Sequence, residues 1–365
     1  MIYISEPTIG NEELENIVNA VKSGWISSKG EFVEKFEKTF ARYCDRKYGI
    51  SCSNGTTALH LALLAVNIKH GDEVIVPNLT FISPANMVRE VGGKPVFVDA
   101  DKDYWGINVH ELEKAITKKT KAIIVVHLYG HPCDMDKILE ISEKYNLYII
   151  EDAAEAHGAK YKDKRVGSFG DISCFSFFGN KNMTTGEGGI CLTDDEKIAD
   201  KINILKNHGM SKTKKYWHDE IGYNYRMTNI QAAIGLAQIG KLDKIVEKKN
   251  LIANQYYHEL KNLIAENKII PHPKMPWAEN VIWLYTILLN NKTEKQRDEI
   301  INKLAEKGIE TRPFFYPLNK MPPYQSNKSF PISEEISLKG ISLPSSARLK
   351  KEEVRFVCNE LKKLI

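Results

Sequence analysis

Short runs of β-branched and other apolar residues alternate with amphipathic stretches over the first three quarters of the chain. The runs predict strands and the stretches predict helices. The predicted strands are residues 73–76, 95–98, 122–127, 147–151, 172–177 and 189–192. The predicted helices are residues 57–67, 84–91, 109–116, 135–145 and 197–207. This alternation indicates an α/β fold with a large, parallel-rich sheet, whose ligands should lie beyond the carboxyl ends of the strands.

The pattern changes in the last third of the chain. A long helical pattern begins near Thr228 and passes through Leu242, and Lys- and Glu-rich segments follow it to about residue 267. A Pro-containing stretch then precedes a predicted strand at 281–288 and predicted helices at 294–307 and 352–364. We therefore expect a large α/β domain over residues 1–245 and a smaller C-terminal α+β domain over residues 246–365.

Composition narrows the class of protein. Hydrophobic residues make up 42% of the 365 positions and charged residues 27%, as in ordinary soluble globular proteins. The net charge is +4 and the basic residues are scattered, which disfavours a nucleic-acid surface. No apolar run is long enough to span a membrane, and the N-terminus does not resemble a signal peptide. None of the six cysteines forms a C-x-x-C pair, so we predict no metal site and a cytoplasmic location.

The segment from Ser173 to Gly189 carries the strongest chemical signal. An apolar strand runs into Gly179, and Lys181 follows at once, so its amine should lie at the rim of the sheet. A lysine that attacks carbonyl groups must be partly neutral, which desolvation behind this strand could achieve. The small residues 184–189 would let the backbone pass close to a ligand. The alternative is that Lys181 is a solvated loop lysine.

Two acidic residues lie at the end of the predicted strand 147–151: Glu151 is its last residue, and Asp152 follows it. Because side chains alternate along a strand, Glu151 and Asp152 should point to opposite sides. A buried carboxylate needs a cationic partner, and a protonated pyridine nitrogen is one that Asp152 could hold. Glu155 lies three residues further on and could reach a phenolic oxygen of the same ring. The alternative for Asp152 is a helix cap.

Two other segments follow strands in the same way. Ser53, Asn54, Gly55 and Thr56 precede a helix, where free backbone N–H groups and the helix dipole favour an anion. We expect Gly55 and Thr56 to donate to a phosphate, although an ordinary N-cap explains the same residues. Neither a P-loop nor a spaced G-x-G-x-x-G occurs, so ATP and dinucleotide binding are unsupported. Phe81 could stack on a flat heterocycle or simply pack in the core.

Together these segments resemble the DegT/DnrJ/EryC1/StrS sugar aminotransferase family of fold-type-I pyridoxal-phosphate enzymes. The resemblance covers nearly the whole chain. It rests on residues 25–30, 53–57, 151–154, 176–181, 186–189, 222–228 and 312–313. Phe-Phe-Gly-Asn-Lys at 177–181 together with Thr-Thr-Gly-Glu-Gly-Gly at 184–189 is most similar to a subgroup that aminates a GDP-linked sugar.

The resemblance implies a role for each matching residue. Lys181 looks like the lysine that holds pyridoxal phosphate as a Schiff base, and Asp152 like the partner of the pyridine nitrogen. The implied phosphate contacts are Gly55, Thr56 and Ser176, the implied stacking residue is Phe81, and Glu155 is a further implied cofactor contact. Asn224 resembles an asparagine that reaches the phosphate of the neighbouring subunit, which implies a homodimer with shared active sites.

The same resemblance implies transfer of an amino group from L-glutamate to a keto group of a nucleotide-linked 4-keto-6-deoxy sugar. Candidate contacts for sugar and diphosphate are Trp25, Lys29, Tyr129, Arg226 and Tyr316. Arginine suits phosphate through its fork of donors, but domain packing or surface ion pairs explain such residues as well. The alternatives are an aminotransferase acting on a small phosphorylated ketone, and a sugar dehydratase with the same cofactor and fold.

Overall fold

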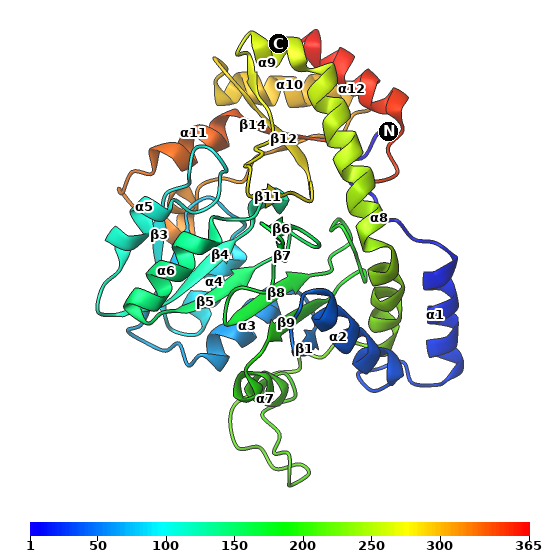
Figure 1. Ribbon diagram of the computed structural model, residues 1–365, viewed down its shortest axis with the longest axis vertical. Helices are drawn as coiled ribbons and strands as arrows, with labels where there is room; N and C mark the ends of the chain where they lie inside the picture. Colours follow the sequence, from blue (N-terminus) through cyan, green and yellow to red (C-terminus); the bar gives the residue numbers. More distant parts are fainter.

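A seven-stranded sheet forms the centre of the protein in a computed structural model that describes all 365 residues (Figure 1). The strands are β1 (Tyr48–Cys52), β2 (Glu73–Pro77), β3 (Lys94–Val98), β4 (Thr120–Val126), β5 (Tyr148–Asp152), β8 (Ile172–Ser176) and β9 (Gly189–Thr193). They lie in the order β1-β9-β8-β5-β4-β2-β3, and only β9 runs antiparallel to its neighbours. The carboxyl ends of the other six strands therefore meet at one edge.

Helices cover both faces of this sheet. They are α2 (Glu31–Tyr43), α3 (Gly55–Ala65), α4 (Ser83–Glu90), α5 (Val109–Leu112), α6 (Met135–Tyr145) and α7 (Glu196–Leu205), with 3-10 turns η1 (Glu113–Ala115) and η2 (Leu128–Gly130). The helix α1 (Asn11–Lys22) packs instead against the long helix at residues 229–259. Alternation along the strands supplies the two faces: Ile150 belongs to the core that contains α3, α4 and α7, whereas Ile149 belongs to the core beneath α5 and α6.

A smaller antiparallel sheet is built from the C-terminal third of the chain. Its order is β10-β12-β14-β13, with β10 (Ile269–Ile270), β12 (Tyr285–Leu289), β13 (Arg312–Pro313) and β14 (Gly340–Leu343). The remaining elements are β6 (Lys160–Tyr161), β7 (Lys164–Arg165), β11 (Ala278–Glu279), α9 (Lys261–Ala265), α10 (Glu294–Glu306), η3 (Leu318–Lys320), η4 (Pro322–Tyr324), α11 (Pro331–Lys339) and α12 (Lys351–Lys362). No helix combines the length and apolar character required to cross a membrane.

The long helix α8 (Asn229–Glu259) connects the two sheets (Figure 1). Thr228 caps it by accepting the N–H of Gln231, as the sequence pattern near Thr228 suggests. Leu242 packs in the core beside the large sheet, whereas Ile252 packs in the core of the small sheet. The division of the chain at residue 245 stays a prediction. It falls inside α8, between the part that packs on the large sheet and the part that packs on the small one.

The six strands and the helices predicted between them are confirmed, with ends within two residues, except that the helix predicted at 109–116 is split between α5 and η1. The strand predicted at 281–288 is wrong at its start, because β12 begins only at Tyr285. Residues 281–284 leave the sheet because Val281 and Trp283 donate their N–H groups to the carbonyls of Gly130 and Tyr129. The hydrophobic pattern alone does not predict α1, α2 or β1.

Candidate active site

The amine of Lys181 lies at the carboxyl edge of the large sheet, in the turn that follows β8. The Lys181 N–H closes this turn by donating to the carbonyl of Phe178 at 3.0 Å. The side chain is only 11% exposed, and Nζ lies 3.9 Å from Oε1 of Glu155 and 3.8 Å from the centre of the Trp283 ring. Lys181 is therefore not a solvated loop lysine.

Burial and the neighbouring carboxylates shift the pKa of this amine in opposite directions. Burial lowers the pKa of Lys181, and the carboxylates of Glu155 and Asp152 act in the opposite direction. Burial also raises the pKa of Glu155, to about 7, although the charge of Lys181 counteracts it. An amine with a lowered pKa, beside a carboxyl group that titrates near neutrality, is suited to proton transfer.

Asp152 is the last residue of β5 and is almost fully buried. It accepts one hydrogen bond, from the N–H of Ala154 at 3.1 Å, and this leaves most of its acceptor capacity free. Burial raises the pKa of Asp152, and the Ala154 N–H and the charge of Lys181 oppose that shift. The helix-cap alternative is wrong, because no helix follows β5 until after the strands β6 to β9.

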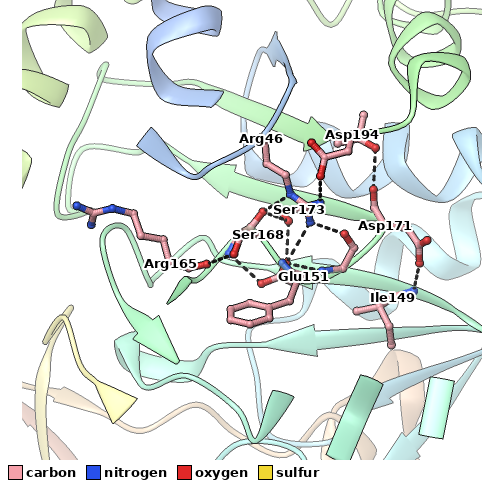
Figure 2. Close-up of polar contacts among 12 residues, drawn as sticks. Arg46, Ile149, Glu151, Arg165, Ser168, Asp171, Ser173 and Asp194 are labelled. Carbon is pink, nitrogen blue, oxygen red and sulfur yellow. Dashed lines mark hydrogen bonds and ion pairs between the residues drawn. The ribbon is translucent and has the colours of Figure 1, made fainter. Parts of the chain in front are cut away.

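Glu151 points to the opposite side of β5, as strand alternation requires, and is fully buried in a separate polar network (Figure 2). Its hydrogen-bond donors are the N–H groups of Gly167, Phe169 and Gly170, the hydroxyl of Ser173 and Nε2 of His127. Arg46 lies 3.7 Å away. Burial would raise the pKa of Glu151, but the hydrogen bond and charge of His127, the charge of Arg46 and the backbone N–H groups prevail and hold it at about 2.

Replacing Glu151 with glutamine should therefore destabilise the protein by about 3 kcal/mol at pH 7, because it leaves Arg46 and several buried N–H groups without their charged partner. A carboxylate with a depressed pKa stabilises the folded state above its unfolded pKa, and this stabilisation is lost as pH falls. The difference between the two proteins should thus shrink from pH 4.5 towards pH 2. Urea unfolding at pH 7, 4 and 3 measures it; a difference that stays constant with pH would contradict this account.

The second oxygen of Glu155 is fixed by a strained turn after β4. Tyr129 adopts a left-handed backbone conformation, with φ of 52°, which non-glycine residues rarely take. Its N–H donates to Oε2 of Glu155 at 2.7 Å. The strained backbone of Tyr129 therefore holds Oε2 of Glu155 and leaves Oε1 facing the amine of Lys181.

The N-terminus of α3 offers an anion site beside these groups. Asn54 caps the helix by accepting the N–H of Thr57 at 2.9 Å, whereas the N–H groups of Gly55 and Thr56 donate to no protein atom. A Cβ at Gly55 would lie 2.7 Å from Cβ of Ser176, so Gly55 permits the close approach of β8. The N-cap interpretation is therefore confirmed, and two free donors remain beside the Ser176 hydroxyl for an anion.

The glycine-rich segment after Lys181 serves packing within the protein. A Cβ at Gly189 would lie 2.3 Å from the carbonyl oxygen of Asn54, and one at Gly188 would lie 2.3 Å from Oγ1 of Thr185. Gly189 thus lets the backbone pack beneath the loop that opens α3. The approach of residues 184–189 to a ligand stays a prediction.

A row of aromatic rings extends from the surface to Lys181. Phe81 is 54% exposed, so it is not a core residue, and its ring lies 5.9 Å from that of Phe315. Phe315 stacks on Tyr129, and Tyr129 stacks on Trp283. Tyr129 is buried among these rings, and its backbone N–H donates to Glu155. Its predicted contact with substrate stays a prediction.

No hydrogen bond or ion pair joins the other five predicted residues to Lys181, Asp152 or Glu155 within this chain. Asn224 and Arg226 contact each other and Asn207 beside the segment that follows α7, which projects from the molecule (Figure 1). The remaining three are the exposed residues Trp25, Lys29 and Tyr316.

Two residues of this region were missed by the sequence analysis. Trp283 comes from the C-terminal third, 102 positions after Lys181 in the sequence, and faces its amine. His127 follows β4 and supports Glu151. No motif marks either residue, because each acquires its place only through tertiary packing.

Comparison with known proteins agrees with this geometry. Residues 7–362 match the DegT/DnrJ/EryC1/StrS aminotransferase family. The chain belongs to this family. The predicted family and the predicted aminotransferase activity are therefore confirmed. Among its relatives, the GDP-perosamine synthase of Escherichia coli O157:H7 is 46% identical over 99% of this chain and 97% of its own length. The enzyme of the same name from Caulobacter vibrioides is 45% identical over 97% of this chain and 95% of its own.

Two solved structures of aminotransferases superpose closely on this chain. Spr1654 of Streptococcus pneumoniae in its PLP form has a TM-score of 0.93 and 29% identity, covering 100% of this chain and 98% of that one. PseC of Helicobacter pylori, an aminotransferase of pseudoaminic acid biosynthesis, has a TM-score of 0.93 and 28% identity with the same coverage. These similarities confirm the predicted fold class.

Proposed function

We propose that this aminotransferase binds pyridoxal phosphate between Lys181 and Asp152 and transfers the amino group of L-glutamate to a nucleotide-linked 4-keto-6-deoxy sugar. The observation that carries the proposal is the buried amine of Lys181 beside two buried carboxyl groups, at the sheet edge where α3 presents free N–H donors. A flat, phosphorylated, cationic ring that carries an aldehyde matches this set of groups.

The residues present fit that cofactor. Gly55, Thr56 and Ser176 offer donors for its phosphate, Asp152 offers a charged acceptor for its pyridine N–H, and Lys181 offers an amine for its aldehyde. Phe81 is exposed and free to stack on the ring, and Glu155 can meet the phenolic oxygen. When bound, pyridoxal phosphate supplies an electron sink for the carbon that gains or loses the amino group.

The chain's own groups then divide the work. Nζ of Lys181 moves a proton to and from the reacting carbon, which requires the neutral form that its burial favours. The carboxylate of Asp152 would stay ionised beside the pyridine N–H of the cofactor and so keep that nitrogen protonated. Glu155, with a pKa of about 7, can hold or release a proton beside Nζ. The buried rings of Tyr129 and Trp283 exclude water from this side of the amine.

The acceptor is inferred from the relatives. Two proteins that match nearly the whole chain at 45–46% identity are named GDP-perosamine synthase, which supports a GDP-linked sugar as substrate. Trp25, Lys29, Arg226 and Tyr316 remain the proposed contacts for sugar and diphosphate. None of the four bonds to Lys181, Asp152 or Glu155 within one chain, and Arg226 bonds instead to Asn224 and Asn207.

A homodimer with shared sites is part of the proposal. Asn224 of one subunit would meet the phosphate held by the other. Exposed apolar side chains support an interface: Leu14, Val18 and Val21 form one face of α1, and Trp217 and Ile221 lie on the projecting segment. Such apolar faces usually mark protein contacts.

The substrate can be tested directly. The purified protein is first treated with ¹⁵N-labelled L-glutamate and freed of it, then given GDP-, dTDP- or UDP-linked 4-keto-6-deoxy sugars or dihydroxyacetone phosphate. We expect ¹⁵N in the GDP-linked sugar, detected by mass spectrometry. Labelling of dihydroxyacetone phosphate alone would favour the small phosphorylated ketone. Loss of water from a sugar without ¹⁵N incorporation would favour a dehydratase.

A further inference from the structure

Trp283 forms the wall against which the Lys181 amine lies. It is 5% exposed and comes from the segment before β12, far from Lys181 in sequence. Nζ of Lys181 is 3.8 Å from the centre of its ring. No acceptor lies within hydrogen-bond distance of this amine, and the nearest carboxyl oxygen, on Glu155, is 3.9 Å away. The indole face is therefore as close to the amine as any charged group.

The indole is held in place from several directions. Its Nε1–H donates to the carbonyl of Asn180, the residue before Lys181, at 2.9 Å. Its backbone N–H donates to the carbonyl of Tyr129 at 3.2 Å, and its ring stacks on the Tyr129 ring at 5.6 Å. The ring therefore cannot turn away from the amine without breaking contacts at both the Lys181 turn and the Tyr129 turn.

A buried lysine completes this support. Nζ of Lys249, in α8, donates to the carbonyl oxygen of Trp283 at 2.9 Å and makes no other hydrogen bond. Burial lowers the pKa of Lys249 to about 7, so placing an amine here costs stability. The only hydrogen-bond partner of this buried amine is the Trp283 carbonyl. We infer that Lys249 is kept, despite the cost in stability, because it fixes the position of Trp283.

An indole face suits an amine that must change its charge. Its electron-rich surface attracts an ammonium group, but it accepts no proton and forms no tight ion pair. A carboxylate at hydrogen-bond distance would hold the ammonium group far more strongly and hinder loss of the proton. The ring can therefore keep the charged amine in place and still let it react.

We propose that the indole face of Trp283 holds the amine of Lys181 each time the lysine is free of the cofactor and carries the proton. Trp283 is then a catalytic residue, because it touches the nitrogen that carries the proton. This inference rests on the proposed function of Lys181 and adds a residue to it. The proton itself moves between Nζ of Lys181 and the reacting carbon, and Trp283 changes neither its bonds nor its charge.

Fluorination of the indole tests this proposal without changing the shape of the site appreciably. The chain has five tryptophans, and cells can replace them all with mono-, di- or trifluorotryptophan. In the full-length protein freed of cofactor, the pKa of Lys181 is measured as the midpoint of its rate of acylation against pH, with the modified peptide identified by mass spectrometry. The charged or titratable groups around the amine are Asp152, Glu155, His157, Arg312 and Lys249, and they are the same in every protein compared.

The direction of the result follows from the ring's charge distribution. Fluorine withdraws electrons from the indole face, so the ammonium form is held less strongly and the pKa of Lys181 should fall with each added fluorine. We expect a total fall of about one pH unit between the unsubstituted and the most fluorinated protein. An unchanged midpoint across the series would overturn the proposal.

Trp283→Phe provides the matched control, because the other four tryptophans still carry fluorine. In this variant the midpoint should not respond to fluorination. An equal response in both backgrounds would also overturn the proposal, because the effect would then come from another tryptophan. Turnover by Lys181→Ala distinguishes the two levels of inference: normal turnover refutes the proposed function, whereas lost turnover with no fluorine effect refutes only the role of Trp283.

Discussion

Lys181→Ala should lose amino transfer by more than about 10⁴-fold, because one substitution removes both the nucleophile and the group that moves the proton. No second amine can replace it. Lys249 is the other buried lysine nearby, and its Nζ is bonded to the Trp283 carbonyl. Release of ¹⁵N-labelled product from labelled L-glutamate measures the loss.

The exposed Lys144, which pairs with Glu113 on the surface, provides the control. Lys144→Ala removes a lysine of equal size and should leave turnover within about twofold of the parent, as surface substitutions usually do. If Lys181→Ala retained more than a hundredth of the parent's turnover, Lys181 would not be the reacting lysine.

Asp152→Asn should reduce turnover on the order of 10³-fold, comparable to the loss of a charge-stabilising group in other active sites. An amide has nearly the same shape but no charge with which to keep the pyridine nitrogen protonated. Asp152 makes only one hydrogen bond within the protein, to Ala154, so the folded state should lose little stability. Turnover and urea unfolding are measured on the same preparation.

The adjacent Glu151 gives a contrast within one strand. Glu151→Gln should lower stability and leave turnover of the folded fraction nearly intact, because its carboxylate faces the Arg46 network (Figure 2). The two variants should therefore show opposite patterns. If Glu151→Gln abolished turnover while Asp152→Asn did not, the assignment of the two faces of β5 would be wrong.

The hydrophobic pattern was sufficient to predict the sheet and the edge at which the site lies. Lys181 follows β8 and Asp152 ends β5, so the predicted strands already place both residues at that edge, whereas Gly55 follows β1, which the pattern does not predict. The opposite orientation of Glu151 and Asp152 follows from strand alternation alone, and the structure confirms it.

What the sequence did not reveal depends on contacts between distant segments. The role of Trp283 requires that residues 281–284 leave the small sheet to bond residues 129–130, and no local pattern indicates this. The conformation of Tyr129, a predicted substrate contact, is likewise hidden from local sequence. Its left-handed backbone places its ring in the aromatic row and directs its N–H towards Glu155.

Reduction with sodium borohydride tests the central claim most directly. If Lys181 is bonded to the aldehyde of pyridoxal phosphate in the purified enzyme, borohydride converts that carbon–nitrogen double bond into a stable single bond. Peptide mass spectrometry should then find the phosphopyridoxyl group on the peptide that contains Lys181 and on no other. Its presence on another lysine, such as Lys249, or on none in a preparation that still transfers amino groups, would contradict the account.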